Sequence, residues 1–254
     1  MKIQKECRLA QEAIEALTES LCGIPNGFDG RAVLMFSGGR DSSAVAAAYC
    51  HAFPESQLHL FFVDNGLLSR TESTERQARL IKNLFPETDV QFHTRRVSQM
   101  MRIAGMQEVE KDFKENGYST LLICVACKLI MNFAAIRFAK ELSTSVVLDG
   151  YAERQAVYPE QTVTFMNFVR DLFKQNDMIY LSPLYRFLSH KEKVNHALKE
   201  LGVRILKQEP VCMWANAFSE AKEDEIEKYL RKTSGIILEH DNVLRPGDMS
   251  EPVE

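Results

Sequence analysis

Hydrophobic residues in this chain alternate between short continuous runs and longer stretches with helical spacing. The short runs are bounded by turn-forming residues and predict buried strands at 32–36, 58–63, 90–94, 146–148 and 178–181. Between them, helical patterns cover 42–50, 71–84 and 119–142. Continuous apolar strands separated by helices are typical of a parallel sheet that is covered on both faces. We therefore predict an α/β fold with a doubly wound, mostly parallel five-stranded sheet, whose ligands bind at the carboxyl ends of the strands.

Helical patterns flank this core at both ends of the chain. Apolar residues at steps of three and four from Ile3 to Leu21 predict an amphipathic helix that packs on the main domain or mediates homodimer formation. A charged helical pattern runs from Ser219 to about Arg231. The segment 95–119 is polar and has no assignable pattern, which favours a mobile flap. The expected divisions are an N-terminal helix over 1–28, the α/β domain over 29–215, and a C-terminal helical extension and tail over 216–254.

The composition is that of an ordinary globular protein. The chain has 254 residues, 45% of them hydrophobic, and its 31 basic and 35 acidic side chains give a net charge of −4. These values exclude a disordered tail, a collagen-like chain and a disulfide-rich miniprotein, and they argue against nucleic-acid binding through bulk positive charge. No apolar run approaches the roughly 18 residues that span a bilayer, and no export signal is evident. We expect a cytoplasmic protein without a membrane partner, in which paired cysteines serve metal binding or catalysis.

The segment 37–43, Ser-Gly-Gly-Arg-Asp-Ser-Ser, directly follows the first predicted strand and opens a helix. Two glycines let the backbone approach a ligand closely, and the helix directs free N–H groups and its positive dipole end at the same place. With the serine hydroxyls and Arg40, this forms a cradle for phosphate or pyrophosphate. The spacing is neither that of a Walker A loop nor that of a dinucleotide-binding loop. Asp41 fits such a cradle as a ligand of Mg²⁺ that bridges the phosphates; a plain glycine turn is the alternative.

This segment resembles the Ser-Gly-Gly-x-Asp-Ser signature of the PP-loop (N-type) ATP pyrophosphatase superfamily, whose fold is adenine nucleotide α-hydrolase-like. The resemblance extends over about residues 30–215. Within it, 62–68 is similar to the adenosine-binding part of the GMP synthetase ATPase domain, and Pro183-Leu184 with 191–194 is similar to a late family element. The resemblance implies that ATP is bound by Phe36, Ser37, Gly38, Gly39, Arg40, Asp41, Ser42, Ser43, Val63, Asp64, Asn65, Gly150 and Lys191. It also implies that a carbonyl oxygen attacks the α-phosphate, pyrophosphate leaves, and nitrogen or sulfur then attacks the adenylated carbon.

Three cysteines suggest which atom makes that second attack. Cys124 and Cys127 lie near the start of a long helical pattern, and residues three apart share a helical face. A helix N-terminus lowers the pKa of a thiol, which makes thiolates available to bind metal or carry sulfur. Such a pair can equally be two small buried residues. Cys212, beyond the fifth predicted strand, favours a site of three thiols.

This arrangement resembles the three-cysteine tRNA thiolases of the superfamily, including the tRNA 2-thiocytidine synthetases. There a Cys-x-x-Cys and one later cysteine hold a [4Fe–4S] cluster and leave one iron open for sulfide, which implies the same for Cys124, Cys127 and Cys212. Soft thiolates suit such a cluster. A second version uses the same residues without a cluster, one cysteine carrying a persulfide and another resolving it. Structural zinc is a third alternative, disfavoured because the sequence offers no close fourth ligand.

The sequence departs from the thiolases after the fourth predicted strand. They usually carry Gly-His followed by paired acids, whereas here Tyr151 follows Gly150 and Arg154-Gln155 stand where acids are expected.

Two further groups of residues each have one functional and one structural interpretation. A basic cluster either contacts an anionic substrate or lies in a solvated loop: His93, Arg95, Arg96 and Arg102. A set within 155–180 either lines the acceptor pocket or belongs to a helix core: Tyr158, Phe165, Phe168, Arg170 and Phe173.

We therefore expect an enzyme, an ATP-dependent sulfurtransferase that adenylates a carbonyl oxygen and replaces it by sulfur at Cys124, Cys127 and Cys212, with Asp41 at the phosphates. Because phosphate contacts with RNA need clustered basic residues, we favour a nucleobase, nucleotide or other small carbonyl compound over tRNA as acceptor. Sulfide or a cysteine desulfurase is the expected sulfur donor. The rivals are an amidotransferase or carbon–nitrogen ligase of the GMP synthetase type, with structural cysteines, and a non-catalytic nucleotide-binding regulator.

Overall fold

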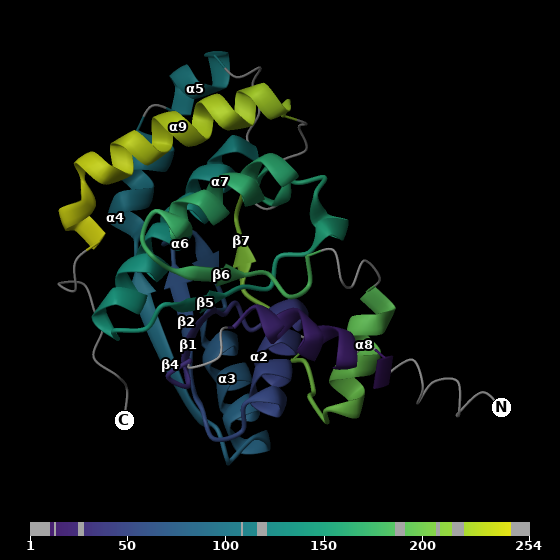
Figure 1. Ribbon diagram of the computed structural model, residues 1–254. Coiled ribbons are helices and arrows are strands. Elements are labelled where there is room, and N and C mark those ends of the chain that lie inside the picture. The colour runs from purple at the N-terminus through teal and green to yellow at the C-terminus, as the bar shows by residue number, and fades with distance from the viewer. Residues whose placement is uncertain are drawn as a thin grey trace.

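Five parallel strands form the central sheet in the order β4-β2-β1-β5-β6 (Figure 1). The protein is described here by a computed structural model covering residues 11–12, 14–24, 28–107, 109–115, 121–185, 191–206, 209–214 and 221–244. The strands of this sheet are β1 (Arg31–Met35), β2 (Gln57–Asp64), β4 (Asp89–Arg96), β5 (Val146–Leu148) and β6 (Ile179–Leu181). The predicted parallel five-stranded α/β fold is confirmed.

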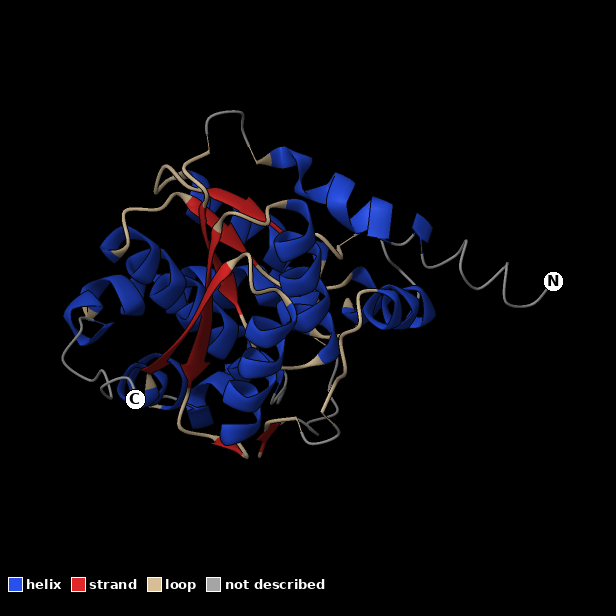
Figure 2. Ribbon diagram, turned by 90° about the horizontal axis from the view of Figure 1, so that it is seen from below, coloured by secondary structure: helices blue, strands red, loops and turns tan. Residues whose placement is uncertain are grey.

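Helices cover both faces of the sheet, as the continuous apolar strands require (Figure 2). One face carries the helical residues 14–20, α2 (Arg40–Ala52), α3 (Glu72–Leu84) and α8 (Lys191–Glu200). The other carries α6 (Leu121–Glu141), α7 (Val163–Lys174) and α9 (Glu223–Glu239). Successive strand residues point to opposite faces, so that in β1 Val33 joins the core under α6 whereas Ala32 and Leu34 join the core under α2.

The order of the strands places a crevice beside β1. After β1, the next strands of the sheet, β2 and β4, lie in order on one side of β1. The chain then returns, and β5 and β6 lie on the other side of β1. The loops that follow β1 and β5 therefore leave the sheet in opposite directions. In open parallel sheets such a switch point opens a ligand-binding crevice at the carboxyl ends of the strands.

Short elements complete the description. A two-stranded antiparallel ribbon pairs β3 (Leu68–Ser69) with β7 (Val211–Cys212). The remaining short elements are α4 (Ser98–Met100), α5 (Val109–Glu115), the π-helix η2 (Met101–Met106), and the 3-10 turns η1 (Leu21–Gly23), η3 (Glu153–Gln155), η4 (Pro159–Gln161) and η5 (Asp241–Leu244).

The expectation of a mobile flap over 95–119 is wrong for most of that segment. The strand β4 continues to Arg96, and residues 98–106 are helical. Met100 and Met101 are buried against the core beneath α6 because their flexible apolar side chains fill the space there. Residue 108 and residues 116–120 lie outside the described part of the chain.

The helix α6 is more apolar than the sequence analysis recognised. Its residues Leu122–Glu141 are long and apolar enough to cross a membrane by length and composition, with 78% of the most apolar window buried inside the protein. Core residues along α6 pack against the sheet, η2 and α9. The apolar character of α6 is therefore accounted for by the packing of this fold.

The basic cluster near β4 does not form an anion site as a group. Arg95 is 3% exposed, and its guanidinium binds the carboxylate of Glu141 at 2.5 Å while lying 5.8 Å from the ring centre of Phe61 and 5.6 Å from that of Phe138. The Nε2 atom of His93 lies 3.0 Å from Nδ1 of His59 on the neighbouring strand. Arg96 and Arg102 remain exposed. The electrostatic partner of Arg95 is thus supplied by α6.

The set within 155–180 belongs mainly to the core. Phe165 and Phe173 of α7 are fully buried, and Phe168 packs against the same cluster. Tyr158 is partly exposed, and the exposed Arg170 bonds to Asn167 within the helix. These five residues do not line the cavity described below.

Removing the two partners of the Arg95–Glu141 pair should have unequal effects. Glu141→Ala leaves a guanidinium buried without its carboxylate and should lower the free energy of unfolding by about 3 kcal/mol. Arg95→Met removes the charge, retains contact with the two phenylalanine rings and should cost about 1 kcal/mol. Urea denaturation measures the free energy of unfolding of both variants. Breaking the exposed pair Glu75–Arg79 is the control and should cost about 0.5 kcal/mol. Equal losses for both variants would contradict this account.

Candidate active site

The loop between β1 and α2 builds an anion cradle at the switch point. Gly38 has φ of 75°, a left-handed conformation that favours glycine, and Gly39 caps α2 in extended geometry. The helix begins at Arg40, so the N–H groups of its first turn have no acceptor within the helix. The hydroxyls of Ser37 and Ser42 lie 3.2 Å apart at the same place. Backbone donors, hydroxyls and the helix dipole therefore converge on one position, which suits a phosphate group.

Two close contacts hold this loop in place, and both require glycine. A Cβ on Gly38 would lie 2.8 Å from Cα of Thr74 in α3, whose hydroxyl donates to the carbonyl of Ser37 at 3.0 Å. A Cβ on Gly150, after β5, would lie 2.7 Å from the backbone nitrogen of Ser42. The loops after β1 and β5 thus touch at backbone distance, and they form the two walls of the crevice.

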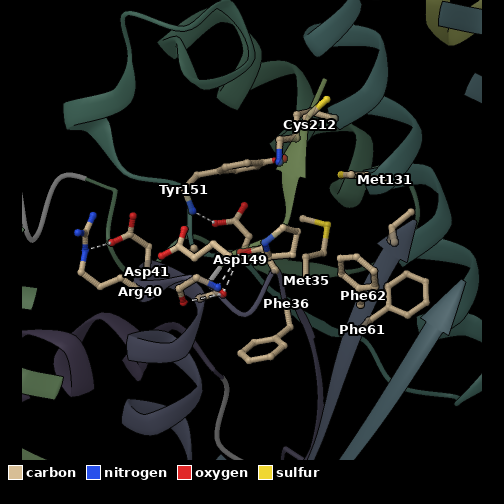
Figure 3. A pocket seen from close by; sticks show the side chains of 18 of the residues that line it. Met35, Phe36, Arg40, Asp41, Phe61, Phe62, Met131, Asp149, Tyr151 and Cys212 are labelled. Carbon is tan, nitrogen blue, oxygen red and sulfur yellow. Dashed lines mark hydrogen bonds and ion pairs between the residues drawn. The ribbon is translucent and has the colours of Figure 1, made fainter. Parts of the chain in front are cut away.

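A cavity of about 390 Å³ opens between these walls (Figure 3). The cradle contributes Ser37, Gly39, Arg40, Asp41 and Ser42. The apolar walls of the cavity come from Met35 and Phe36 and, on β2, from Phe62 and Val63. Such walls suit a planar nucleobase. Gly150, Lys128 and Cys212 also line it, so one cavity joins the phosphate cradle to one of the predicted thiols.

Five residues predicted to contact ATP lie outside this lining. Gly38 packs against Thr74 of α3, and Ser43 is buried within the first turn of α2. Lys191 is exposed at the start of α8. Asp64 and Asn65 shape the loop after β2 instead: Asp64 Oδ1 accepts from the Gly66 nitrogen at 2.8 Å, and Asn65 Oδ1 accepts from the Leu67 nitrogen at 2.8 Å. The lysine that lines the cavity is Lys128, on α6 directly after Cys127, rather than Lys191.

The loop after β2 connects two of the three cysteines. Buried Asn65 donates from Nδ2 to Sγ of Cys127 at 3.0 Å. Three residues later, Leu68 pairs with Cys212 in the β3–β7 ribbon. One short segment therefore contacts a thiol of α6 and pairs with the strand that carries Cys212, which lines the cavity.

Burial reverses the predicted acidity of the cysteine pair. Burial raises the pKa of Cys124 to about 12, and the charges of Glu160, Cys127 and Cys212 add to that shift. Burial likewise raises the pKa of Cys127, against Lys128 and the hydrogen bond from Asn65. Loss of hydration therefore outweighs the helix N-terminus, and these thiols are protonated until a metal or a bound substrate displaces the proton.

The cysteine thiols and the oxygen donors of the cradle suit different metals. In the described part of the chain, no three His, Cys, Asp or Glu side chains converge on a single metal ion. Soft thiolates are the ligands of iron–sulfur clusters, in which each cysteine binds a different iron. For Mg²⁺, the carboxylate of Asp41 beside the hydroxyls of Ser37 and Ser42 is the oxygen-rich set expected when substrate phosphates supply the other ligands.

The carboxylate of Asp41 is engaged by two arginines. Arg154, from η3, forms an ion pair with Oδ1 of Asp41, and Nε of Arg40 lies 3.4 Å from the same oxygen. Arg154 and Asp41 are 16% and 15% exposed, so water screens this pair only in part. Sequence analysis noted Arg154 as a departure from the thiolases and assigned it no role.

Asp149 is a further cavity residue that the sequence analysis left without a role. It directly follows β5, and it accepts hydrogen bonds from the hydroxyls of Tyr180 and Ser182 and from the backbone nitrogen of Tyr151. Burial raises the pKa of Asp149 to about 6 despite these bonds. Its position directly after a parallel strand is the signal that could have identified it. Glu209, whose carboxylate lies beside Gly39, had no comparable signal.

The strand order and the serine–glycine loop at the switch point define the adenine nucleotide α-hydrolase-like fold of the PP-loop ATP pyrophosphatases. The structure is similar to U34-tRNA thiolase NcsA from Methanococcus maripaludis with its [4Fe–4S] cluster, with a TM-score of 0.55 and 12% identity over 98% of this chain and 81% of that one. It is also similar to a 4-thiouridine synthetase bound to RNA and ATP, with a TM-score of 0.62 and 16% identity over 85% of this chain. This chain covers 53% of the length of that synthetase. No protein-family model and no curated protein sequence matches the chain.

Gly150→Ala should weaken nucleotide binding by roughly tenfold to a hundredfold, because the added methyl group displaces the N-terminus of α2 from the cradle. Isothermal titration calorimetry with ATP and Mg²⁺ measures the loss. Gly235→Ala in α9 is the matched control: a Cβ there meets nothing within 4 Å, so binding should not change and the helix should gain about 0.5–1 kcal/mol. Unchanged binding in the Gly150 variant would show that the two loops adjust independently.

The pKa of Asp149 predicts a pH-dependent contribution to stability. A carboxyl whose pKa is raised by folding stabilises the folded state most fully below its unfolded value of 3.8, and that contribution is lost as the pH rises through about 6. The free energy of unfolding of the wild type minus that of Asp149→Asn should fall by about 2 kcal/mol between pH 4 and pH 8. Urea denaturation across this range measures it. A difference that rises with pH would mean that the hydrogen bonds to Asp149 outweigh its burial.

Proposed function

We propose that the protein is an ATP-dependent sulfurtransferase, which adenylates a carbonyl oxygen of its acceptor and replaces that oxygen by sulfur. The observation that carries the proposal is that the phosphate cradle and Cys212 line a single cavity. An enzyme that couples ATP cleavage to sulfur transfer needs the activated carbon to lie within reach of both. The fold shared with two thiolases of known structure supports the same assignment.

The cradle performs the first half of this reaction. The carbonyl oxygen attacks the α-phosphorus, the bond from that phosphorus to the bridging oxygen breaks, and pyrophosphate leaves with its electron pair. Ser37, Ser42 and the first-turn N–H groups of α2 hold the departing phosphates, and Asp41 holds Mg²⁺ when it is bound. Phe62 and Val63 provide the apolar wall for adenine. Catalysis here consists of positioning and of stabilising charge on the phosphates.

The cysteines perform the second half. A sulfur nucleophile attacks the adenylated carbon, the carbon–oxygen bond to AMP breaks, and AMP leaves. A [4Fe–4S] cluster held by Cys124, Cys127 and Cys212 would supply the place where sulfide is kept. Without a cluster, the persulfide of one cysteine attacks the carbon, and a second cysteine then attacks the inner sulfur, which releases the thiocarbonyl product and leaves a disulfide.

We propose a nucleobase, nucleotide or other small carbonyl compound as the acceptor, with sulfide or a cysteine desulfurase as donor. The burial of Arg95 against Glu141 removes one cation from the surface that a polyanion would contact. Both similar structures are named for RNA substrates, so tRNA is the competing acceptor. The two classes are separated by supplying each of them with ATP, Mg²⁺ and sulfide under anaerobic conditions.

The decisive experiment follows AMP, pyrophosphate and thiolated product after anaerobic purification, together with iron and sulfide content. Cys212→Ala should abolish thiolated product, because that thiol lines the cavity, whereas Cys50→Ala, in buried α2 outside the site, should leave it unchanged. About four irons per chain, lost in the Cys212 variant, would establish the cluster version. A colourless protein that forms thiolated product with a cysteine desulfurase as donor, and not with sulfide alone, would establish the persulfide version, because sulfide cannot form a persulfide without an oxidant.

Two results would overturn the proposal. Full turnover with ammonia in Cys124→Ala and Cys212→Ala would make the protein a carbon–nitrogen ligase with structural cysteines. ATP binding without pyrophosphate release for any carbonyl acceptor would make it a nucleotide-binding regulator.

A further inference from the structure

The ion pair between Asp41 and Arg154 joins a candidate Mg²⁺ ligand to a candidate phosphate-binding residue of the cradle. Asp41 is the carboxylate best placed to hold Mg²⁺, and its Oδ1 is already bound by the guanidinium of Arg154. Arg154 reaches it from η3, four residues after the glycine that packs on the N-terminus of α2. The cation position beside Asp41 is therefore taken by a guanidinium of the chain itself.

Two guanidinium groups lie at the carboxylate of Asp41. Those of Arg40 and Arg154 both contact its Oδ1, next to the positive end of the α2 dipole. All three side chains are mostly buried, with 15% to 22% of their surface exposed. Arg40 and Asp41 line the cavity together with Gln155, the neighbour of Arg154, and with Glu209, whose carboxylate lies beside Gly39. An anion that enters the cradle therefore meets the guanidinium of Arg40 and the N-terminus of α2 at this wall.

A guanidinium is suited to exchange one anion for another. It carries five N–H donors in a planar fork that matches carboxylate and phosphate oxygens in the same way. A triphosphate brings more negative charge than a single carboxylate, so it is the stronger partner for Arg154. Once Arg154 turns to phosphate, the Asp41 carboxylate loses a cation and becomes a ligand for Mg²⁺.

We propose that Arg154 is a phosphate-binding residue that occupies Asp41 when the cradle is empty and transfers to the β- or γ-phosphate when a nucleotide binds, releasing Asp41 to Mg²⁺. This inference rests on the proposed ATP-binding function and deepens it. It makes nucleotide and Mg²⁺ binding cooperative through the protein, beyond their affinity for each other in solution. It also gives a physical role to the arginine that stands where the thiolases carry acids.

The test uses three probes with the intact protein: pyrophosphate in EDTA, Mg²⁺ alone, and ATP with Mg²⁺, each by isothermal titration calorimetry. Arg154→Gln should weaken pyrophosphate binding in EDTA by about tenfold or more, because a charged hydrogen-bond donor is lost. The same variant should bind Mg²⁺ alone severalfold more tightly, because Asp41 is left with one cation fewer. These opposite shifts distinguish ligand exchange from general damage to the site.

Asp41→Asn provides the reciprocal measurement. It should bind pyrophosphate in EDTA at least as tightly as the wild type, because Arg154 is released, whereas added Mg²⁺ should no longer strengthen ATP binding. Arg170→Gln, an exposed arginine on α7, is the matched control and should change none of the three affinities. Thermal unfolding verifies that each variant is folded, and Arg154→Lys, which retains the charge without the fork, replaces Arg154→Gln if that protein does not fold.

The outcomes separate this inference from the proposed function. Arg154→Gln with pyrophosphate affinity within about twofold of the wild type, or with pyrophosphate and Mg²⁺ weakened in parallel, overturns the role of Arg154 while leaving ATP binding intact. A wild-type protein that binds neither ATP nor pyrophosphate overturns the proposed function as well. Opposite shifts in the two variants support the exchange whether or not sulfur transfer is detected.

Discussion

The backbone contact between Gly150 and the first turn of α2 is the constraint on which the rest of the site depends. At the switch point, the loops after β1 and β5 separate, and a crevice forms only if their first residues remain close. Gly150 permits this because a Cβ there would lie 2.7 Å from the Ser42 nitrogen. The contact fixes the direction of the α2 N–H groups, and it also fixes the origin of η3, which carries Arg154 back to the cradle.

A second constraint acts through the loop after β2. Its turn is closed by the side chains of Asp64 and Asn65, which accept from backbone nitrogens two residues further on. The turn thereby directs Nδ2 of Asn65 to Cys127 and presents Leu68 to Cys212. This turn, closed by its own backbone hydrogen bonds, thus connects a cysteine of α6 with the strand that carries Cys212, which lines the cavity.

Burial governs the electrostatics of the whole molecule. It raises the pKa of Asp149 and of the cysteine pair, because removal of water disfavours the charged form more than nearby donors favour it. Arg95 remains buried because Glu141 and two aromatic rings supply partners. The pair at the cradle is less deeply buried than Arg95. Asp41 and Arg154 bind each other at the edge of a cavity, where a ligand that enters can compete for either partner.

The sequence by itself determined the fold class, the strands and the cradle, because each is encoded locally: apolar runs define buried strands, and the Ser-Gly-Gly segment defines a tight turn before a helix. It also indicated which thiols belong together, through the spacing of Cys124 and Cys127 and a resemblance for Cys212. Only the tertiary structure decided that Lys128 rather than Lys191 lines the cavity, that Arg95 serves the core, that burial raises the thiol pKa, and that Arg154 meets Asp41. These facts depend on residues more than a hundred positions apart or on burial by other elements, and a local pattern carries no information about either.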